Sequence, residues 1–159
     1  MAFFVGRPMV VGAPEEVHTS QKNPLGTIAR GSDGYYYIYL QGVASTVAGD
    51  VVTFNTAFAT ARLVAGAKGG VAVALAAVDA TTEYGWYGYI GSFTVNVASA
   101  VASNVQVYAS GTAGNVDDTL VKDDQLFNVN SGATLASGAG TIAVKIWAAP
   151  SIGSTIQSA

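Results

Sequence analysis

The sequence predicts an all-β fold: a single compact β-sandwich or small β-barrel domain with an extended N-terminal arm. Short runs rich in Val, Ile, Tyr and Phe recur along the chain, and several of them alternate apolar with polar residues. Clusters of Gly, Asn, Asp and Ser separate these runs, as turns do between strands. Helix is the weaker interpretation of every run, so the pattern favours a sandwich or barrel over βαβ units.

The length and composition fit one domain made of small side chains. A chain of 159 residues can bury one sizeable core, and two independent cores are not expected. Hydrophobic residues make up 50% of the chain and charged residues only 11%, with 19 Gly. We divide the chain into an extended arm over residues 1–24, a β domain over 25–148 and a C-terminal tail over 149–159.

The arm is predicted from its prolines. Residues 1–24 hold three of the four prolines and show no strand or helix period. Proline fixes φ and biases the preceding residue toward extended geometry. We expect Phe3, Phe4 and Met9 to bind a neighbouring subunit, and a disordered terminus is the alternative. The short apolar start lacks the basic residues and cleavage pattern of a signal peptide.

The strands are predicted in chain order. Residues 25–30 and 35–40 flank the turn sequence Gly31-Ser32-Asp33-Gly34, which predicts a hairpin. Residues 71–78 are Ala-rich enough to permit a short helix, but their alternation favours a strand. The remaining predicted strands are 51–54, 60–65, 84–90, 93–97, 105–109, 126–129 and 141–147.

The strand at 84–90 carries large rings on both faces. Alternation places Tyr84 and Trp86 on one face, and Tyr87 and Tyr89 on the other. Such a strand lies in the centre of a sandwich or has one face covered by a partner; an aromatic platform that binds sugars is the alternative. The predicted surface for contacts with other subunits comprises Phe3, Phe4, Met9, Tyr35, Tyr37, Trp86, Tyr87 and Tyr89.

The residue inventory offers little for catalysis, and we predict no enzyme activity and no cofactor. The absence of Cys excludes disulfides, thiolate metal sites and cysteine nucleophiles. His18, the only His, lies in the predicted arm and is expected to be solvated or at an interface. No Gly-x-Ser-x-Gly motif is present, so a hydrolase triad is not expected.

One acidic cluster is a candidate metal site. Asp117, Asp118, Asp123 and Asp124 could share Ca²⁺, which takes six to eight oxygen ligands. The spacing of a calcium-binding EF-hand loop is missing, and Lys122 lies within the cluster. A solvated turn is therefore the favoured interpretation, and no metal is predicted.

The charge balance limits the partners. Seven Lys and Arg residues and a net charge of -3 cannot neutralise a run of phosphates, so no nucleic acid is expected. The most apolar stretch, residues 69–78, is shorter than the roughly 20 residues of a membrane helix, so no membrane is expected. A surface this weakly charged predicts partial coverage by protein neighbours and a homo-oligomer, with a trimer as the expected assembly.

Several segments, taken in order, carry a resemblance to a known family. They are Leu25-Gly26-Thr27, Asp33-Gly34-Tyr35, Ala48-Gly49-Asp50-Val51-Val52, Gly70-Val71-Ala72-Val73-Ala74, Glu83-Tyr84-Gly85-Trp86, Val105-Gln106-Val107-Tyr108, Gly111-Thr112-Ala113-Gly114 and Ala143-Val144-Lys145-Ile146. Together they resemble the capsid decoration (cement) proteins of tailed bacteriophages, of the small Ala/Gly/Val-rich β type.

This resemblance implies a structural protein without enzyme activity. It implies a location in the virion, on the outer capsid surface, and binding to the major capsid protein, often as a trimer. The implied role is to stabilise contacts between capsid subunits. A carbohydrate-binding or adhesive β module on a virion or cell surface is the alternative function.

Overall fold

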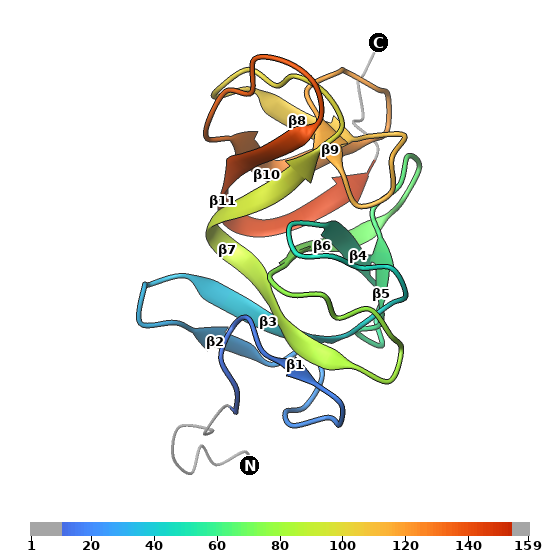
Figure 1. The fold of residues 1–159 in the computed structure, drawn as a ribbon, viewed down its shortest axis with the longest axis vertical. Helices are drawn as coiled ribbons and strands as arrows, with labels where there is room; N and C mark the ends of the chain where they lie inside the picture. The colour runs from blue at the N-terminus through green and yellow to red at the C-terminus, as the bar shows by residue number, and fades with distance from the viewer. Residues whose placement is uncertain (1–10, 154–159) are drawn as a thin grey trace, which may run out of the picture.

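The computed structural model describes residues 11–153, which form strands and turns without a helix (Figure 1). The predicted all-β fold is therefore confirmed. The strands are β1 (Val17–His18), β2 (Ile28–Arg30), β3 (Tyr36–Gln41), β4 (Val51–Phe54), β5 (Thr60–Arg62), β6 (Gly69–Ala74), β7 (Tyr84–Val97), β8 (Gln106–Ala109), β9 (Val116–Asp117), β10 (Gln125–Ser131) and β11 (Gly140–Gly153). Phe3, Phe4 and Met9 lie outside the described residues.

All of these strands join one sheet, and β7 is its central element. The strand order is β2-β3-β7-β9-β8-β10-β11-β6-β4-β5, and β1 also pairs with β7. The pairing of β7 with β9 is parallel, and the other pairings of these strands are antiparallel. Figure 1 shows β7 running from the lower part of the molecule, beside β1 and β3, into the upper part beside β11.

The structure joins two predicted strands into one. Residues 84–90 and 93–97 were predicted separately, but β7 continues through both. Its partner changes at Gly91, because Tyr36–Gln41 of β3 pair with the first half and β11 pairs with the second half. Gly91 has a φ of 145°, which glycine adopts at low cost, so the strand turns there without ending.

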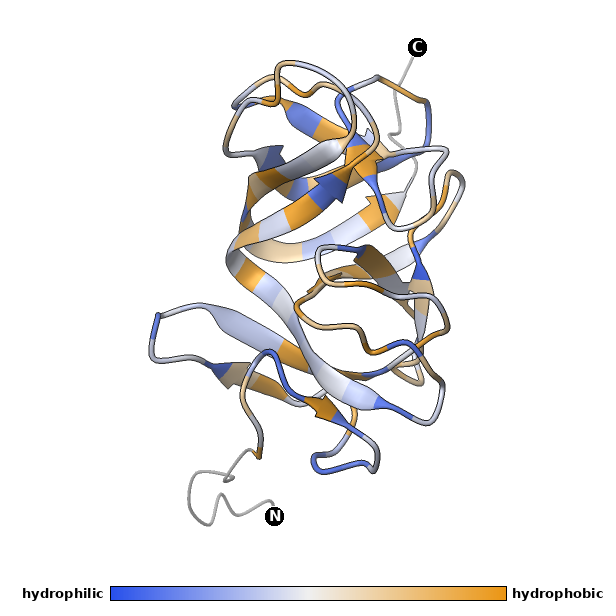
Figure 2. Ribbon diagram, viewed as in Figure 1, coloured by the Kyte–Doolittle hydropathy of each residue, from blue (hydrophilic) through white to orange (hydrophobic). Residues whose placement is uncertain are grey.

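Both faces of the first half of β7 are buried within the chain. Trp86 belongs to one hydrophobic cluster, together with Tyr39 and Phe93. Tyr87 belongs to a second cluster, together with Leu40. In Figure 2 the lower part of β7 shows no alternation of hydropathy, whereas the upper part, beside β11, alternates hydrophobic with hydrophilic residues as a half-buried strand does. Of the two explanations for rings on both faces, the structure shows a central strand.

The prediction of an extended arm over residues 1–24, separate from the β domain, is wrong for residues 11–24, which pack on that domain. The side chain of Asn23 makes two hydrogen bonds of 2.9 Å to the backbone of Val11. Its Oδ1 accepts from the Val11 N–H, and its Nδ2 donates to the Val11 carbonyl. The indole Nε1 of Trp86 also donates to the carbonyl of Val11, at 3.0 Å. Val17 and His18 then pair with β7. These contacts join residues far apart in sequence, so the local hydrophobic periodicity could not predict them.

The predicted C-terminal tail from residue 149 is also wrong as far as Gly153. Strand β11 continues to Gly153, and its last residues pair with β10 and with Gly69 and Gly70 of β6. Pro150 lies where the β10–β11 register is interrupted. A proline tolerates such an irregularity, because no ladder hydrogen bond is required of its nitrogen. The side chain of Asn128 donates to the carbonyl of Ala149 there, at 3.0 Å.

Candidate functional site

Three of the five predicted contact residues that the structure describes are buried inside the chain. Tyr37, Trp86 and Tyr87 are 7%, 3% and 0% exposed, so they cannot reach a partner, and the prediction is wrong for them. Their rings serve the core instead, as in the edge-on contact of Trp86 with Tyr39, whose ring centroids are 5.1 Å apart. Tyr35 and Tyr89 are half-buried.

A sugar platform centred on Trp86 is excluded by the same burial. The exposed tryptophan is Trp147 on β11, which is 57% exposed. The sequence carried a signal for it, since Ile142, Val144 and Ile146 alternate inward and Trp147 falls on the opposite face.

His18 was predicted to be solvated or at an interface with a partner, and within the chain it is 4% exposed. Its Nδ1 and the Tyr39 hydroxyl share a hydrogen bond of 2.7 Å, and that hydroxyl also accepts from the backbone N–H of Lys22 at 3.2 Å. The Nε2 of His18 lies 3.6 Å from the Glu16 carboxylate. These contacts tie the first described residues to β3, which is a structural role.

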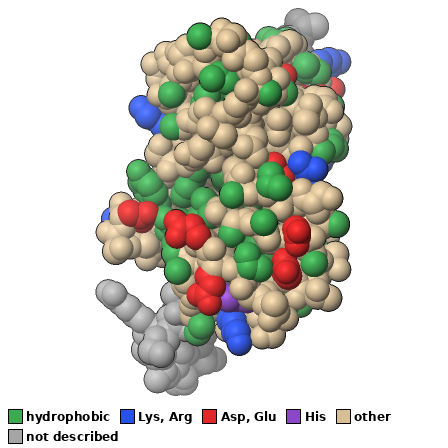
Figure 3. All heavy atoms as spheres, in the orientation of Figure 1, with side chains coloured by type: hydrophobic (Ala, Val, Ile, Leu, Met, Phe, Trp, Pro, Cys, Tyr) green, Lys and Arg blue, Asp and Glu red, His purple; other side chains and the backbone are tan. Residues whose placement is uncertain are grey.

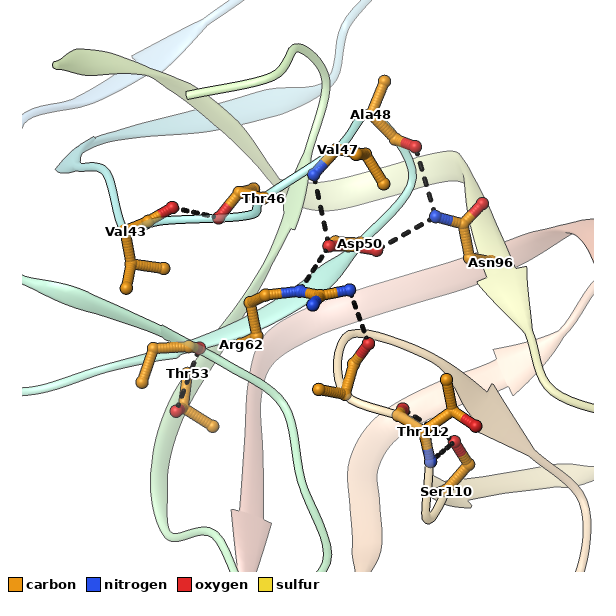
Figure 4. Close-up of polar contacts among 12 residues, drawn as sticks. Val43, Thr46, Val47, Ala48, Asp50, Thr53, Arg62, Asn96, Ser110 and Thr112 are labelled. Atoms are coloured by element: carbon orange, nitrogen blue, oxygen red, sulfur yellow. Dashed lines mark hydrogen bonds and ion pairs between the residues drawn. The ribbon is translucent and has the colours of Figure 1, made fainter. Parts of the chain in front are cut away.

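A buried carboxylate, Asp50, organises the middle of the molecule (Figure 4). It accepts hydrogen bonds from Arg62 Nε at 2.8 Å, from Asn96 Nδ2 at 3.0 Å and from the backbone N–H of Val47 at 3.2 Å. Arg62 also donates to the carbonyl of Ala113 at 2.7 Å. This cluster, the Asp50 network, joins the turn before β4 to β5, β7 and the loop before β9. Sequence reasoning gave no ligand or catalytic role to Asp50, and its saturated hydrogen bonding indicates a structural one.

The acidic residues near 117–124 hold loops in place. Asp118 accepts from the backbone N–H of Ala102 at 2.9 Å, and Asp117 accepts from that of Thr119 at 3.0 Å. Burial raises the pKa of the Asp117 carboxyl. Asp124 is buried and accepts from the N–H of Gly66. Within residues 11–153, no group of three or more His, Cys, Asp or Glu side chains is placed to hold a metal ion.

Two neighbouring loops expose large apolar side chains. The first, residues 63–68, shows Val64 at 45% exposure, and the second, residues 118–124, shows Leu120 at 75% and Val121 at 42%. The loops are joined by the Gly66 hydrogen bond to Asp124 and by the Lys68 ammonium, which donates to the carbonyl of residue 123 at 3.1 Å. We call them the loop pair.

A cleft of about 360 Å³ lies where β7 passes from β3 to β11. Figure 3 shows a hollow between the upper and lower parts of the molecule, with hydrophobic and acidic side chains along it. We call it the waist cleft; it is lined by Pro14, Glu15, Asp33, Tyr35, Tyr37, Ala48, Gly49, Ala74, Leu75, Ser92, Phe93, Thr94, Asn96 and Thr141. Of the predicted contact residues within 11–153, Tyr35 and Tyr37 line it.

Comparisons with protein-family models, with curated proteins and with solved structures find no match to this chain. In the described part of the chain, no helix has the length and hydrophobicity needed to cross a membrane.

Proposed function

We propose that this chain is a decoration (cement) protein that binds the outer surface of an assembled phage head and stabilises contacts between capsid subunits. In this proposal the major capsid protein is the partner, and the chain itself forms a trimer. The role is structural and involves no catalysis. The resemblance of residues 25–147 to decoration proteins supports it, together with the low share of charged residues, 11%.

The observation that carries the proposal is the loop pair. Leu120 is 75% exposed at a position held by neighbouring hydrogen bonds, and Val64 and Val121 add further exposed apolar surface. Hydrophobic side chains presented on anchored loops lose little conformational entropy when they dock. The partner assigned to this surface is the capsid protein, because a chain with few charged groups is suited to lasting coverage by protein.

The energies are adequate for a cement role. Full burial of one Leu or Val side chain stabilises a complex by about 1.5 to 3 kcal/mol. Because the protein binds only assembled shells, this binding free energy stabilises the assembled state by mass action. Many copies on one shell multiply the effect.

The direct test is an image reconstruction of virions of the phage that encodes this chain, in which the β domain should fit density on the outer shell. Co-sedimentation with those heads measures the binding of two matched variants. Leu120→Asp should weaken binding by about tenfold or more, the equivalent of 1.4 kcal/mol. Ile28→Asp, at another exposed apolar position on edge strand β2, should bind as the unchanged protein does.

Two results would overturn the proposal. One is a virion with no density for this domain on its outer surface. The other is a chain that stays monomeric in light scattering at high concentration and does not sediment with heads.

A further inference from the structure

The waist cleft has the shape and chemistry of a ligand site, and it is separate from the loop pair. Its volume of about 360 Å³ falls within the range of small-molecule pockets. Its walls come from segments between Pro14 and Thr141, brought together where β7 changes partners.

The carboxylate of Asp33 is fixed at one end of the cleft. Its Oδ1 accepts from the backbone N–H of Tyr35 at 3.0 Å, and its Oδ2 accepts from the Tyr37 hydroxyl. The Tyr37 hydrogen bond, with that of Tyr35, lowers the pKa of Asp33. Each carboxylate oxygen can accept a second hydrogen bond, so Asp33 offers oriented acceptors to a ligand.

An aromatic ring is fixed beside this carboxylate. The ring of Tyr35 packs against Gly91, where a Cβ atom would lie 2.5 Å from the Tyr35 Cγ. Its edge meets Phe93, with centroids 5.6 Å apart and an interplanar angle of 67°. Tyr35 remains half-exposed and lines the cleft, so it offers an apolar surface of set orientation.

The other lining groups on β7 and β11 are polar and uncharged. Ser92, Thr94 and Thr141 carry exposed hydroxyls. The amide nitrogen of Asn96 donates to the carbonyl of Ala48 at 3.2 Å and to Asp50, which leaves Asn96 Oδ1 as an acceptor. The Asp50 network therefore holds one wall of the cleft.

These groups select the charge of the ligand. Among residues 11–153, the charged residues that line the cleft are Glu15 and Asp33, and no Lys or Arg lines it, so an anion is disfavoured. A cationic side chain would use the carboxylates and leave the hydroxyls and the amide without a role. An uncharged sugar uses both kinds of polar group, since its hydroxyls pair with Asp33 and with the neutral groups while a C–H face packs on Tyr35.

We propose that the waist cleft binds a short, uncharged oligosaccharide, oriented by Asp33 and Tyr35. This function is additional to head binding and does not depend on it. A decoration protein with such a site would attach the particle to glycans on another surface.

The test uses the full chain on an array of neutral hexose and N-acetylhexosamine oligosaccharides, followed by calorimetry with the strongest ligand. Ser92→Trp fills the cleft from an exposed position and should abolish binding. Asp33→Asn removes the charged acceptor and should weaken binding by about tenfold, as expected for a hydrogen bond to a charged group. Asp79→Asn, which removes an exposed carboxylate outside the cleft, should have no effect.

Thermal melting of each variant separates loss of the site from loss of the fold. The proposal is overturned if no neutral glycan binds, or if Ser92→Trp binds as the unchanged chain does, since the site would then lie elsewhere. It is also overturned if only a cationic probe, acetyl-arginine amide, binds in the cleft. Ser92→Trp should still sediment with phage heads, so failure of the cleft and failure of the cement proposal give different results.

Discussion

Replacing Arg62 with Met tests the Asp50 network. Asp50 has a side chain that is 1% exposed, and Arg62 supplies the cation at 2.8 Å. In the variant the carboxylate stays buried and keeps only neutral donors, from Asn96 and Val47. Removing one partner of a buried ion pair costs about 3 to 5 kcal/mol.

Arg62 itself is 27% exposed, so part of that cost is already relieved by water in the native protein. We therefore expect Arg62→Met to lower the free energy of unfolding by about 2 to 3 kcal/mol, below the fully buried case. For a chain of this size that corresponds to a fall of about 5 to 10 °C in Tm. Urea unfolding followed by Trp fluorescence measures it.

Two further variants make the result specific. Arg30→Met removes an exposed arginine whose guanidinium lies 5.9 Å from the Tyr36 ring centroid, and it should cost under about 1 kcal/mol. The double variant Asp50→Asn/Arg62→Met removes the buried charge together with its partner, so it should lose less stability than the sum of the single variants. If Arg62→Met and Arg30→Met were equally stable, the network would not hold the fold in the way described.

Three other predictions follow from buried groups. Tyr39→Phe should cost about 1 to 3 kcal/mol because it removes two hydrogen bonds, whereas Tyr87→Phe should cost almost nothing, since the Tyr87 hydroxyl is buried without a hydrogen bond in the described structure; urea unfolding compares the two. Burial raises the pKa of the Tyr37 and Tyr87 phenols above their ordinary value, so the unfolded chain releases these protons first as pH rises. Their contribution to stability is therefore present below about pH 10 and lost above it, and a native absorbance titration should show late-ionising tyrosines. Deleting residues 1–20 removes β1 and should lower Tm by several degrees; an unchanged Tm would contradict the structural role given to that segment.

Local patterns explain which elements could be predicted. The strand at 51–54 matches β4, β2 lies within the predicted 25–30, and β3 is displaced by one residue from the predicted 35–40, because alternation and turn residues act over a few positions. Strand β6 begins at Gly69, two residues before the predicted 71–78, and it ends at Ala74, so residues 75–78 lie outside the strand. The two-residue strands β1 and β9 carry no pattern long enough to read.

The candidate sites depend on contacts that local patterns do not encode. The waist cleft joins Asp33, Asn96 and Thr141, which become neighbours only because β7 turns at Gly91 and changes partners. The Asp50 network likewise depends on Arg62 and on a carbonyl in the following loop. Tyr35 was predicted to contact other subunits, and lining the cleft is a different role that its sequence position did not indicate.

Glycine has two roles in this chain, and only one of them could be predicted from the sequence. As turn punctuation it was read correctly at Gly34, whose φ of 87° suits a turn. Inside strands it supplies space for rings. Gly70 of β6 lies under the ring of Phe54, so closely that a Cβ atom could not be added without displacing it. Because glycine has no Cβ atom, the aromatic ring packs directly on the backbone of the strand.

The same arrangement builds the floor of the waist cleft. A Cβ atom at Gly88 would lie 2.7 Å from the Phe93 ring, and one at Gly91 would lie 2.5 Å from that of Tyr35. Phe93 and Tyr35 meet edge to face, so two glycines of β7 set the positions of both rings. Overpacking a core position costs about 1 to 3 kcal/mol, and at Gly88 or Gly91 that strain would fall on the rings that shape the cleft. The same residues of β7 therefore determine both the core packing and the shape of the waist cleft.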